Sequence, residues 1–159
     1  MSKQLLVTDV MTRNVVSVSP DMPLAEAARI IADHNFNGVP VVDSKETLIG
    51  ILTEYDLISK SSAVHLPTFQ ILLQNLQVLR GDKSKFQKEV EEIAALTVKD
   101  VMNTDPLTLP ESATYEEAII AFTEHHRVNP IPVVDVERKV VGVVSRFDVL
   151  KPLHLIINA

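Results

Sequence analysis

Apolar residues recur along this chain with two periods, one helical and one strand-like. Positions i, i+3, i+4 and i+7 are apolar over 24–31 and again over 115–122, which predicts two amphipathic helices. Further helices are expected to begin near Glu54 and near Arg146. The predicted order is strand, helix, strand, strand, helix, and it occurs twice. Strands are expected, from runs rich in β-branched residues, at 15–19, 39–43, 47–53, 106–110, 131–135 and 139–145.

The first helix of each copy has its own start signal. Thr114 and Glu117 form the T-x-x-E pattern of a capping box, in which each side chain bonds the backbone N–H of the other residue. In the first copy, Pro23 suits the first turn of a helix, where no backbone N–H is needed. These signals agree with the helical periodicity that follows them.

Landmarks that recur in the same order show that the chain is an internal repeat. "TDVM" at 8–11 corresponds to "KDVM" at 99–102, and the Glu-Ala pair at 26–27 to that at 117–118, both with an offset of 91 residues. "PVVD", and then "GILTEYDL" and "GVVSRFDV", recur with an offset of 92. The second copy therefore has one extra residue, near the end of its first helix.

The repeats predict three parts of the chain: a first copy at 1–58, an insertion at 59–96, and a second copy with a short tail at 97–159. The apolar spacing of the insertion predicts a helical hairpin. It is expected to pack beside the second helix of the first copy or to offer a dimer or partner surface. The apolar tail at 153–159 favours a homodimer, because exposed apolar segments associate.

Composition narrows the class of protein. The net charge is −6, which argues against a nucleic-acid partner and against an anionic membrane surface. The absence of cysteine excludes disulfides, thiolate catalysis and cysteine-based zinc sites. The N-terminal sequence lacks the apolar core of a signal peptide, and no run is long enough to span a membrane. A cytoplasmic protein is expected.

The repeated phrase has two interpretations. Thr53 and Asp56 stand at the N-cap and N3 positions of the predicted helix, where a hydroxyl and an acid stabilise its start without any ligand. The same site could bind a nucleoside. A helix start attracts phosphate, a carboxylate accepts hydrogen bonds from ribose hydroxyls, and the aliphatic Ile51 offers a wall for a base. Spacing alone leaves both interpretations open.

The ordered set of motifs, "DVM", "EA", "PVVD" and G-h-h-[T/S]-x-x-D (h, aliphatic), present twice, closely resembles a pair of CBS domains. That resemblance implies an α/β fold of tandem β-α-β-β-α units related by a pseudo-twofold axis, with a cleft on each side. It further implies regulation through binding of adenosine derivatives (AMP, ADP, ATP or S-adenosylmethionine) and no required cofactor. Such pairs commonly form homodimers.

The family's binding positions can be transferred where the motifs match. The resemblance implies that Asp56 and Asp148 hold ribose hydroxyls, and that Thr53 and Ser145 lie near the ribose and phosphate. The other implied contacts are Ile51 and Val143 at the base, Val16 and Leu107 from the first strands, and Phe36, Asn37, Val128 and Asn129 from the segments before the "PVVD" strands.

The two copies differ in charge. Glu54 in the first copy corresponds to Arg146 in the second, and "EHHRVN" at 124–129 adds further basic residues. Because a guanidinium binds phosphate well, the cleft of the second phrase is expected to hold a phosphorylated ligand. An exposed helix-start residue is the alternative role for Arg146. Pro130 and the extra residue are expected to reshape that cleft.

Three functional hypotheses follow. The first is a stand-alone ligand sensor that acts through an unidentified effector protein. The second is a dimerisation or scaffold module with degenerate clefts and no ligand. The third, an enzyme, has no support, because no catalytic motif is present and the two aspartates of the phrase belong to separate clefts. The five histidines lack the spacing of a metal site.

Overall fold

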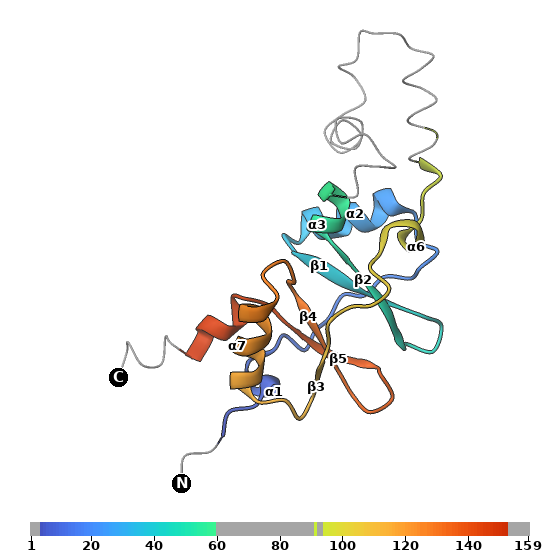
Figure 1. The fold of residues 1–159 in the computed structure, drawn as a ribbon. Coiled ribbons are helices and arrows are strands. Elements are labelled where there is room, and N and C mark those ends of the chain that lie inside the picture. Colours follow the sequence, from blue (N-terminus) through green and yellow to red (C-terminus); the bar gives the residue numbers. More distant parts are fainter. Residues whose placement is uncertain (1–3, 60–90, 92–93, 153–159) are drawn as a thin grey trace.

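The computed structural model describes residues 4–59, 91 and 94–152. Most of the predicted hairpin and the whole C-terminal tail lie outside these residues. The elements, shown in Figure 1, are α1 (Val7–Val10), α2 (Leu24–Asp33), β1 (Gly38–Val42), β2 (Leu48–Thr53), α3 (Glu54–Ser59), α6 (Val98–Val101), β3 (Leu109–Pro110), α7 (Tyr115–Glu124), β4 (Ile131–Val134), β5 (Val140–Val144) and the 3₁₀-helix η1 (Asp148–Leu150).

Each copy builds a small sheet around an antiparallel hairpin. β1 pairs with β2, and β4 pairs with β5 in the equivalent register, so that Pro40 faces Ile51 and Pro132 faces Val143. In the second copy, β3 adds a parallel strand beside β4. The predicted mixed α/β fold of two like units is confirmed.

The first strand of each copy is shorter than the sequence predicts. In the first copy only Val18 pairs, through a parallel bridge to Val41. Val18 is buried, whereas Val16 is 37% exposed, so the apolar run at 15–19 does not drive a full strand into the core. In the second copy the strand is Leu109–Pro110. Proline at position 110 cannot donate a ladder hydrogen bond, which limits the pairing there.

Each copy lends its first short helix to the core of the other copy. Val98 and Val101 of α6 are buried with α2, β1 and β2 of the first copy. Val7 and Val10 of α1 are buried with α7, β4 and β5 of the second copy. Figure 1 shows this exchange, with α6 beside α2 and α1 beside α7. Each of the two cores therefore contains residues of both copies, so the copies do not fold around separate cores.

The predicted capping box begins α7. The N–H of Glu117 donates to the Thr114 hydroxyl at 3.1 Å, and the N–H of Thr114 donates to the Glu117 carboxylate at 2.7 Å. The Thr114 N–H and the Thr114 hydroxyl, which donates to the same carboxylate oxygen at 3.0 Å, hold the pKa of Glu117 below its usual value.

The extra residue of the second copy lies after its first helix. α2 and α7 have the same length, ten residues, and the offset of 91 relates their ends. The offset becomes 92 at Val39 of β1 and Ile131 of β4, so the insertion falls within 125–130. This segment contributes directly to the site described below.

Candidate functional site

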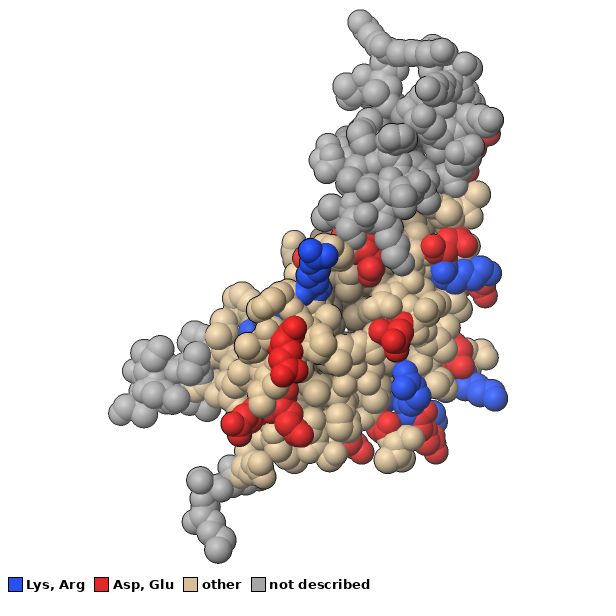
Figure 2. All heavy atoms as spheres, viewed as in Figure 1, with Lys and Arg blue, Asp and Glu red and all other residues tan. Residues whose placement is uncertain are grey.

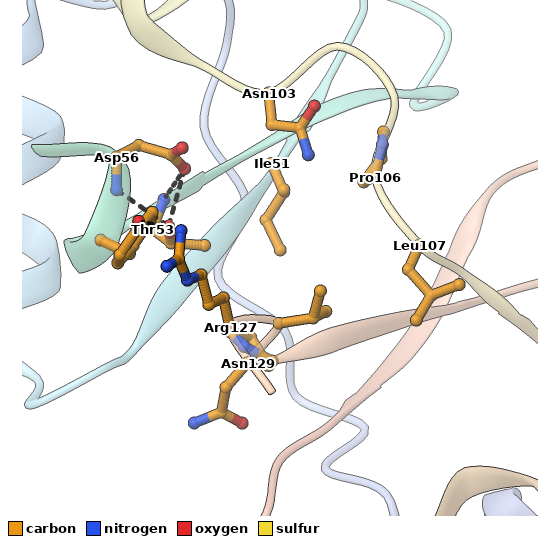
Figure 3. A pocket seen from close by; sticks show the side chains of 11 residues that line it. Ile51, Thr53, Asp56, Asn103, Pro106, Leu107, Arg127 and Asn129 are labelled. Atoms are coloured by element: carbon orange, nitrogen blue, oxygen red, sulfur yellow. Dashed lines mark hydrogen bonds between the residues drawn. The ribbon is translucent and has the colours of Figure 1, made fainter. Parts of the chain in front are cut away.

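A cavity of about 210 Å³ lies between the two copies of the repeat. The first copy provides the end of β2 and the start of α3, and the second provides two loop segments. Figure 3 shows Thr53 and Asp56 at one end of this space and Leu107 at the other. The residues that line it are Ile51, Thr53, Tyr55, Asp56, Asn103, Pro106, Leu107, Arg127, Val128, Asn129 and Pro130.

Thr53 and Asp56 form the helix cap that their spacing predicts. The Thr53 hydroxyl donates to Asp56 Oδ2 at 2.7 Å, the N–H of Thr53 donates to the same oxygen at 3.0 Å, and the N–H of Asp56 donates to the Thr53 hydroxyl at 3.2 Å. Both bonds to the carboxylate use Oδ2. Within the described part of the chain, Oδ1 has no such partner, so the cap leaves it available to a ligand in the cavity.

Ser145 and Asp148 form the equivalent cap in the second copy, but this carboxylate is saturated. Asp148 Oδ2 accepts from the N–H of Ser145 at 2.7 Å and from its hydroxyl at 2.8 Å. Asp148 Oδ1 forms an ion pair with Lys151. Asp148 is 5% exposed. Internal partners therefore occupy both of its oxygens, in contrast to Asp56.

The Arg146 side chain is directed at its own repeat. Its guanidinium donates to the carbonyl oxygens of Phe122, His125 and His126 at 3.3, 3.2 and 2.8 Å, and it lies 5.2 Å from the centre of the Phe122 ring. The last carbonyls of a helix have no partner within it, so a guanidinium satisfies them well. In the described residues, the guanidinium of Arg146 therefore has carbonyl partners within its own repeat.

Arg127 places the positive charge in the cavity instead. Its Nη1 donates to the Tyr55 hydroxyl at 2.9 Å, and its Cζ lies 5.5 Å from the centre of the Tyr55 ring. Tyr55 belongs to α3 of the first copy, so this contact crosses between the repeats. The sequence indicated Arg127 only as one of several basic residues near the second phrase. The signal that singles it out is the extra residue in the 125–130 segment.

The other predicted binding residues divide between the cavity and other surroundings. Ile51, Leu107, Val128 and Asn129 line the cavity, and so does Pro130, which the sequence analysis expected to reshape the cleft of the second phrase. Three further lining residues were not suggested by the sequence: Tyr55, Asn103 and Pro106. Val16, Phe36, Asn37 and Val143 do not line it.

Two of these remaining residues have clear partners within the first copy. Phe36 stacks on His34 with ring centres 5.0 Å apart. Asn37 donates through Nδ2 to Glu54 Oε1 at 3.2 Å, and its carbonyl accepts the Glu54 N–H at 2.9 Å. The pairing with Asn37 gives the Glu54 carboxylate a partner, and Glu54 is not part of the lining of the cavity.

A second hollow, of about 200 Å³, lies near the turns of the two hairpins. Arg13, Glu46 and Lys139 contribute its charges, and Lys139 is paired with Glu137 at 3.0 Å. None of the predicted binding residues lines this hollow.

The CBS-domain family model matches residues 7–63 and 98–155, which cover both repeats. The chain belongs to the CBS-domain family. The double match agrees with the two like units of the fold, so the protein is a CBS pair. Among the described residues, no helix is long and apolar enough to cross a membrane.

Two relatives of different kinds match about nine tenths of this chain. The inosine-5'-monophosphate dehydrogenase of Methanocaldococcus jannaschii is 29% identical over 143 residues, which are 90% of this chain and 22% of that enzyme. The chloroplastic CBS domain-containing protein CBSX2 of Arabidopsis thaliana is 26% identical over 148 residues, 91% of this chain and 62% of that protein. The chain therefore spans less than two thirds of the length of either relative.

Solved CBS pairs have the same fold. The structure of CBSX2 in complex with AMP is 25% identical, has a TM-score of 0.71, and covers 96% of this chain and 98% of its own. The CBS pair of protein MJ0100, in complex with 5'-methylthioadenosine and S-adenosyl-L-methionine, is 24% identical with a TM-score of 0.67 over 96% and 98%. The latter likeness shows the fold alone.

Proposed function

We propose that this CBS pair is a regulatory sensor that binds an adenosine derivative in the cavity beside Asp56. One observation carries the proposal: the same cavity contains an aliphatic wall and the Asp56 carboxylate, whose Oδ1 is not used by the helix cap. Ile51, Leu107 and Val128 provide apolar surface for a flat base. In this proposal, Asp56 Oδ1 accepts hydrogen bonds from a ribose diol.

The relatives support this class of ligand. The crystallised chain of CBSX2, which matches 96% of this chain, was solved in complex with AMP. The pair from MJ0100 was crystallised with two other adenosine derivatives. These ligands share an adenosine unit and differ at the 5' position, so they favour an adenosine site and leave the 5' group open.

We also propose that the second cleft implied by the family binds a ligand, although fewer observations support this cleft than the Asp56 cavity. Val143, Ser145 and Asp148 would provide its phrase, and Val16, Phe36 and Asn37 would complete it. Since Lys151 and Ser145 already occupy the Asp148 carboxylate, a ribose there would have to displace an ion pair. We therefore expect the Asp56 cavity to bind first.

Binding between the repeats suggests how the signal leaves the site. A ligand that touches both copies shifts their relative arrangement by its differential affinity for the two arrangements. Regulation of an effector protein, rather than catalysis on the bound nucleotide, follows from this role. Mass spectrometry of the nucleotide after incubation would test it, because an enzyme would release a modified product.

A homodimer is also proposed, and exposed apolar side chains favour it. Phe147 is 81% exposed, and Ile120 of α7 and Leu150 of η1 are each 48% exposed. Exposed apolar groups of this size mark association surfaces when they are contiguous. This surface equally supports the alternative function of a dimerisation module. Light scattering coupled to size exclusion would show a dimer, and Phe147→Ser should shift it toward monomer.

Calorimetric titration with AMP, ADP, ATP and S-adenosylmethionine separates the sensor from the scaffold. At a protein concentration of about 100 μM, binding free energies of roughly −5 to −6 kcal/mol give a measurable signal. We expect heat with at least one compound. No heat with any of them would leave the scaffold as the better account.

A further inference from the structure

We propose that Arg127 makes the site selective for a nucleoside 5'-monophosphate. On binding, the guanidinium of Arg127 breaks its hydrogen bond to Tyr55 and binds the phosphate of the ligand. The inference rests on the proposed function and extends it, because it names the charged part of the ligand and the contact that the ligand replaces.

The partner of Arg127 is one that a phosphate can outcompete. The guanidinium is exposed, and among the residues that the structure describes it contacts a neutral phenol oxygen and the face of the same ring. Hydrogen bonds between a guanidinium and a phosphate are charge-assisted, frequently bidentate, and stronger than those to a neutral oxygen. Arg146 offers the opposite case, because three carbonyls hold its guanidinium within its own repeat.

The charges that line the cavity fit one phosphate. Arg127 is the one cation and Asp56 the one anion among the lining residues that the structure describes. On the face shown in Figure 2, Lys and Arg side chains lie next to Asp or Glu and do not form a continuous basic area. A monophosphate therefore finds a partner in Arg127, the sulfonium of S-adenosylmethionine meets a like charge, and a polyphosphate gains no further lining cation.

The size of the cavity supports the exchange of partners. Its volume of about 210 Å³ is below the range of roughly 300–1,000 Å³ that is typical of small-molecule sites. Arg127 and Tyr55 both line it, so separating them widens the space as the phosphate enters. Since Tyr55 belongs to the first copy and Arg127 to the second, the exchange alters a contact between the repeats.

The test compares adenosine with AMP by calorimetry, at low and high salt, on the full chain and three variants. We expect wild-type protein to bind AMP about tenfold or more tightly than adenosine, with a preference that falls as salt rises. Arg127→Gln should bring the two affinities within about threefold, because it should weaken AMP binding far more than adenosine binding. Arg29→Gln, which makes the same charge change at an exposed position of α2 outside the cavity, should retain the wild-type preference.

Tyr55→Phe tests the exchange separately from the selection. It keeps the ring and removes the hydroxyl that accepts from Arg127, so AMP should bind as tightly as to wild type or more tightly. Weaker AMP binding by Tyr55→Phe would contradict the exchange. Equal affinities of wild type for AMP and adenosine, or parallel losses of both in Arg127→Gln, would overturn the selection and leave the adenosine site standing. Binding of neither compound would overturn both proposals.

Discussion

The backbones of Ile51 and Asn103 form two hydrogen bonds, each 2.9 Å long, and so join a strand of the first repeat to a loop of the second. Thr12 and Val143 form the same pair at the equivalent position of the other half. The Ile51–Asn103 pair fixes the strand that ends at Thr53 beside the segment that leads to Leu107. The two walls of the cavity are therefore held together by backbone, and their spacing depends little on side chains.

Gly50 should be essential to this junction. A Cβ at position 50 would lie 2.8 Å from the carbonyl oxygen of Asn103, a backbone atom that the pairing with Ile51 holds in place. Gly50→Ala should therefore lower the free energy of unfolding by roughly 1–3 kcal/mol, as measured by urea denaturation. Gly142→Ala is the matched control. Its Cβ would meet the flexible Met11 side chain, so it should cost less, and the opposite order would contradict the account.

The two aspartates of the repeated phrase should have different effects. Asp56→Ala should weaken binding of an adenosine derivative by about tenfold or more, because it removes a charged acceptor of ribose hydroxyls. Asp148→Ala should mainly destabilise the fold, since it removes the carboxylate that pairs with Lys151 and accepts from Ser145. Calorimetry and thermal denaturation of both variants provide the comparison. From the charge of Arg146, the sequence analysis expected the cleft of the second phrase, to which Asp148 belongs, to hold the phosphorylated ligand.

Arg146 should be a stabilising residue. Arg146→Ala removes three hydrogen bonds to carbonyls that follow or end α7, and we expect a loss of about 1–3 kcal/mol in the free energy of unfolding. The ratio of AMP to adenosine affinity should stay at the wild-type value. A variant with unchanged stability and weakened AMP binding would show that the guanidinium serves a ligand after all.

The capping box of α7 should make stability depend on pH. The backbone N–H and hydroxyl of Thr114 hold the pKa of Glu117 below its unfolded value. The contribution is therefore complete above the usual pKa of a glutamate, about 4.3, and is lost as the pH falls through the lower folded-state pKa. Glu117→Gln keeps an acceptor but cannot titrate. The stability difference between wild type and this variant, from urea curves, should shrink below about pH 4.3; a constant difference would refute the assignment.

The sequence predicted the fold because its signals are local and repeated. The structure contains the elements that these local signals predict. They are the helices expected from the spacing at 24–31 and 115–122, the Thr114 cap, and the duplicated "PVVD" strands. The exchange of α1 and α6 was not predicted, because sequence spacing does not say which copy's core buries a short apolar helix.

The different contacts of Arg127 and Arg146 could not be predicted from the sequence. Both Arg127 and Arg146 are cations near the second phrase, and their charges alone do not distinguish them. The difference arises from α7, whose terminal carbonyls lie within reach of Arg146, and from the extra residue, which extends the loop that carries Arg127 to Tyr55. Such long-range geometry is absent from a local motif.

A crystal structure of the chain grown with AMP tests the central claim most directly. The account predicts nucleotide density in the cavity between the repeats, with the ribose at Asp56, the base against Ile51 and Leu107, and the phosphate at Arg127. Density confined to the Ser145 and Asp148 side, or no nucleotide at saturating AMP, would contradict it.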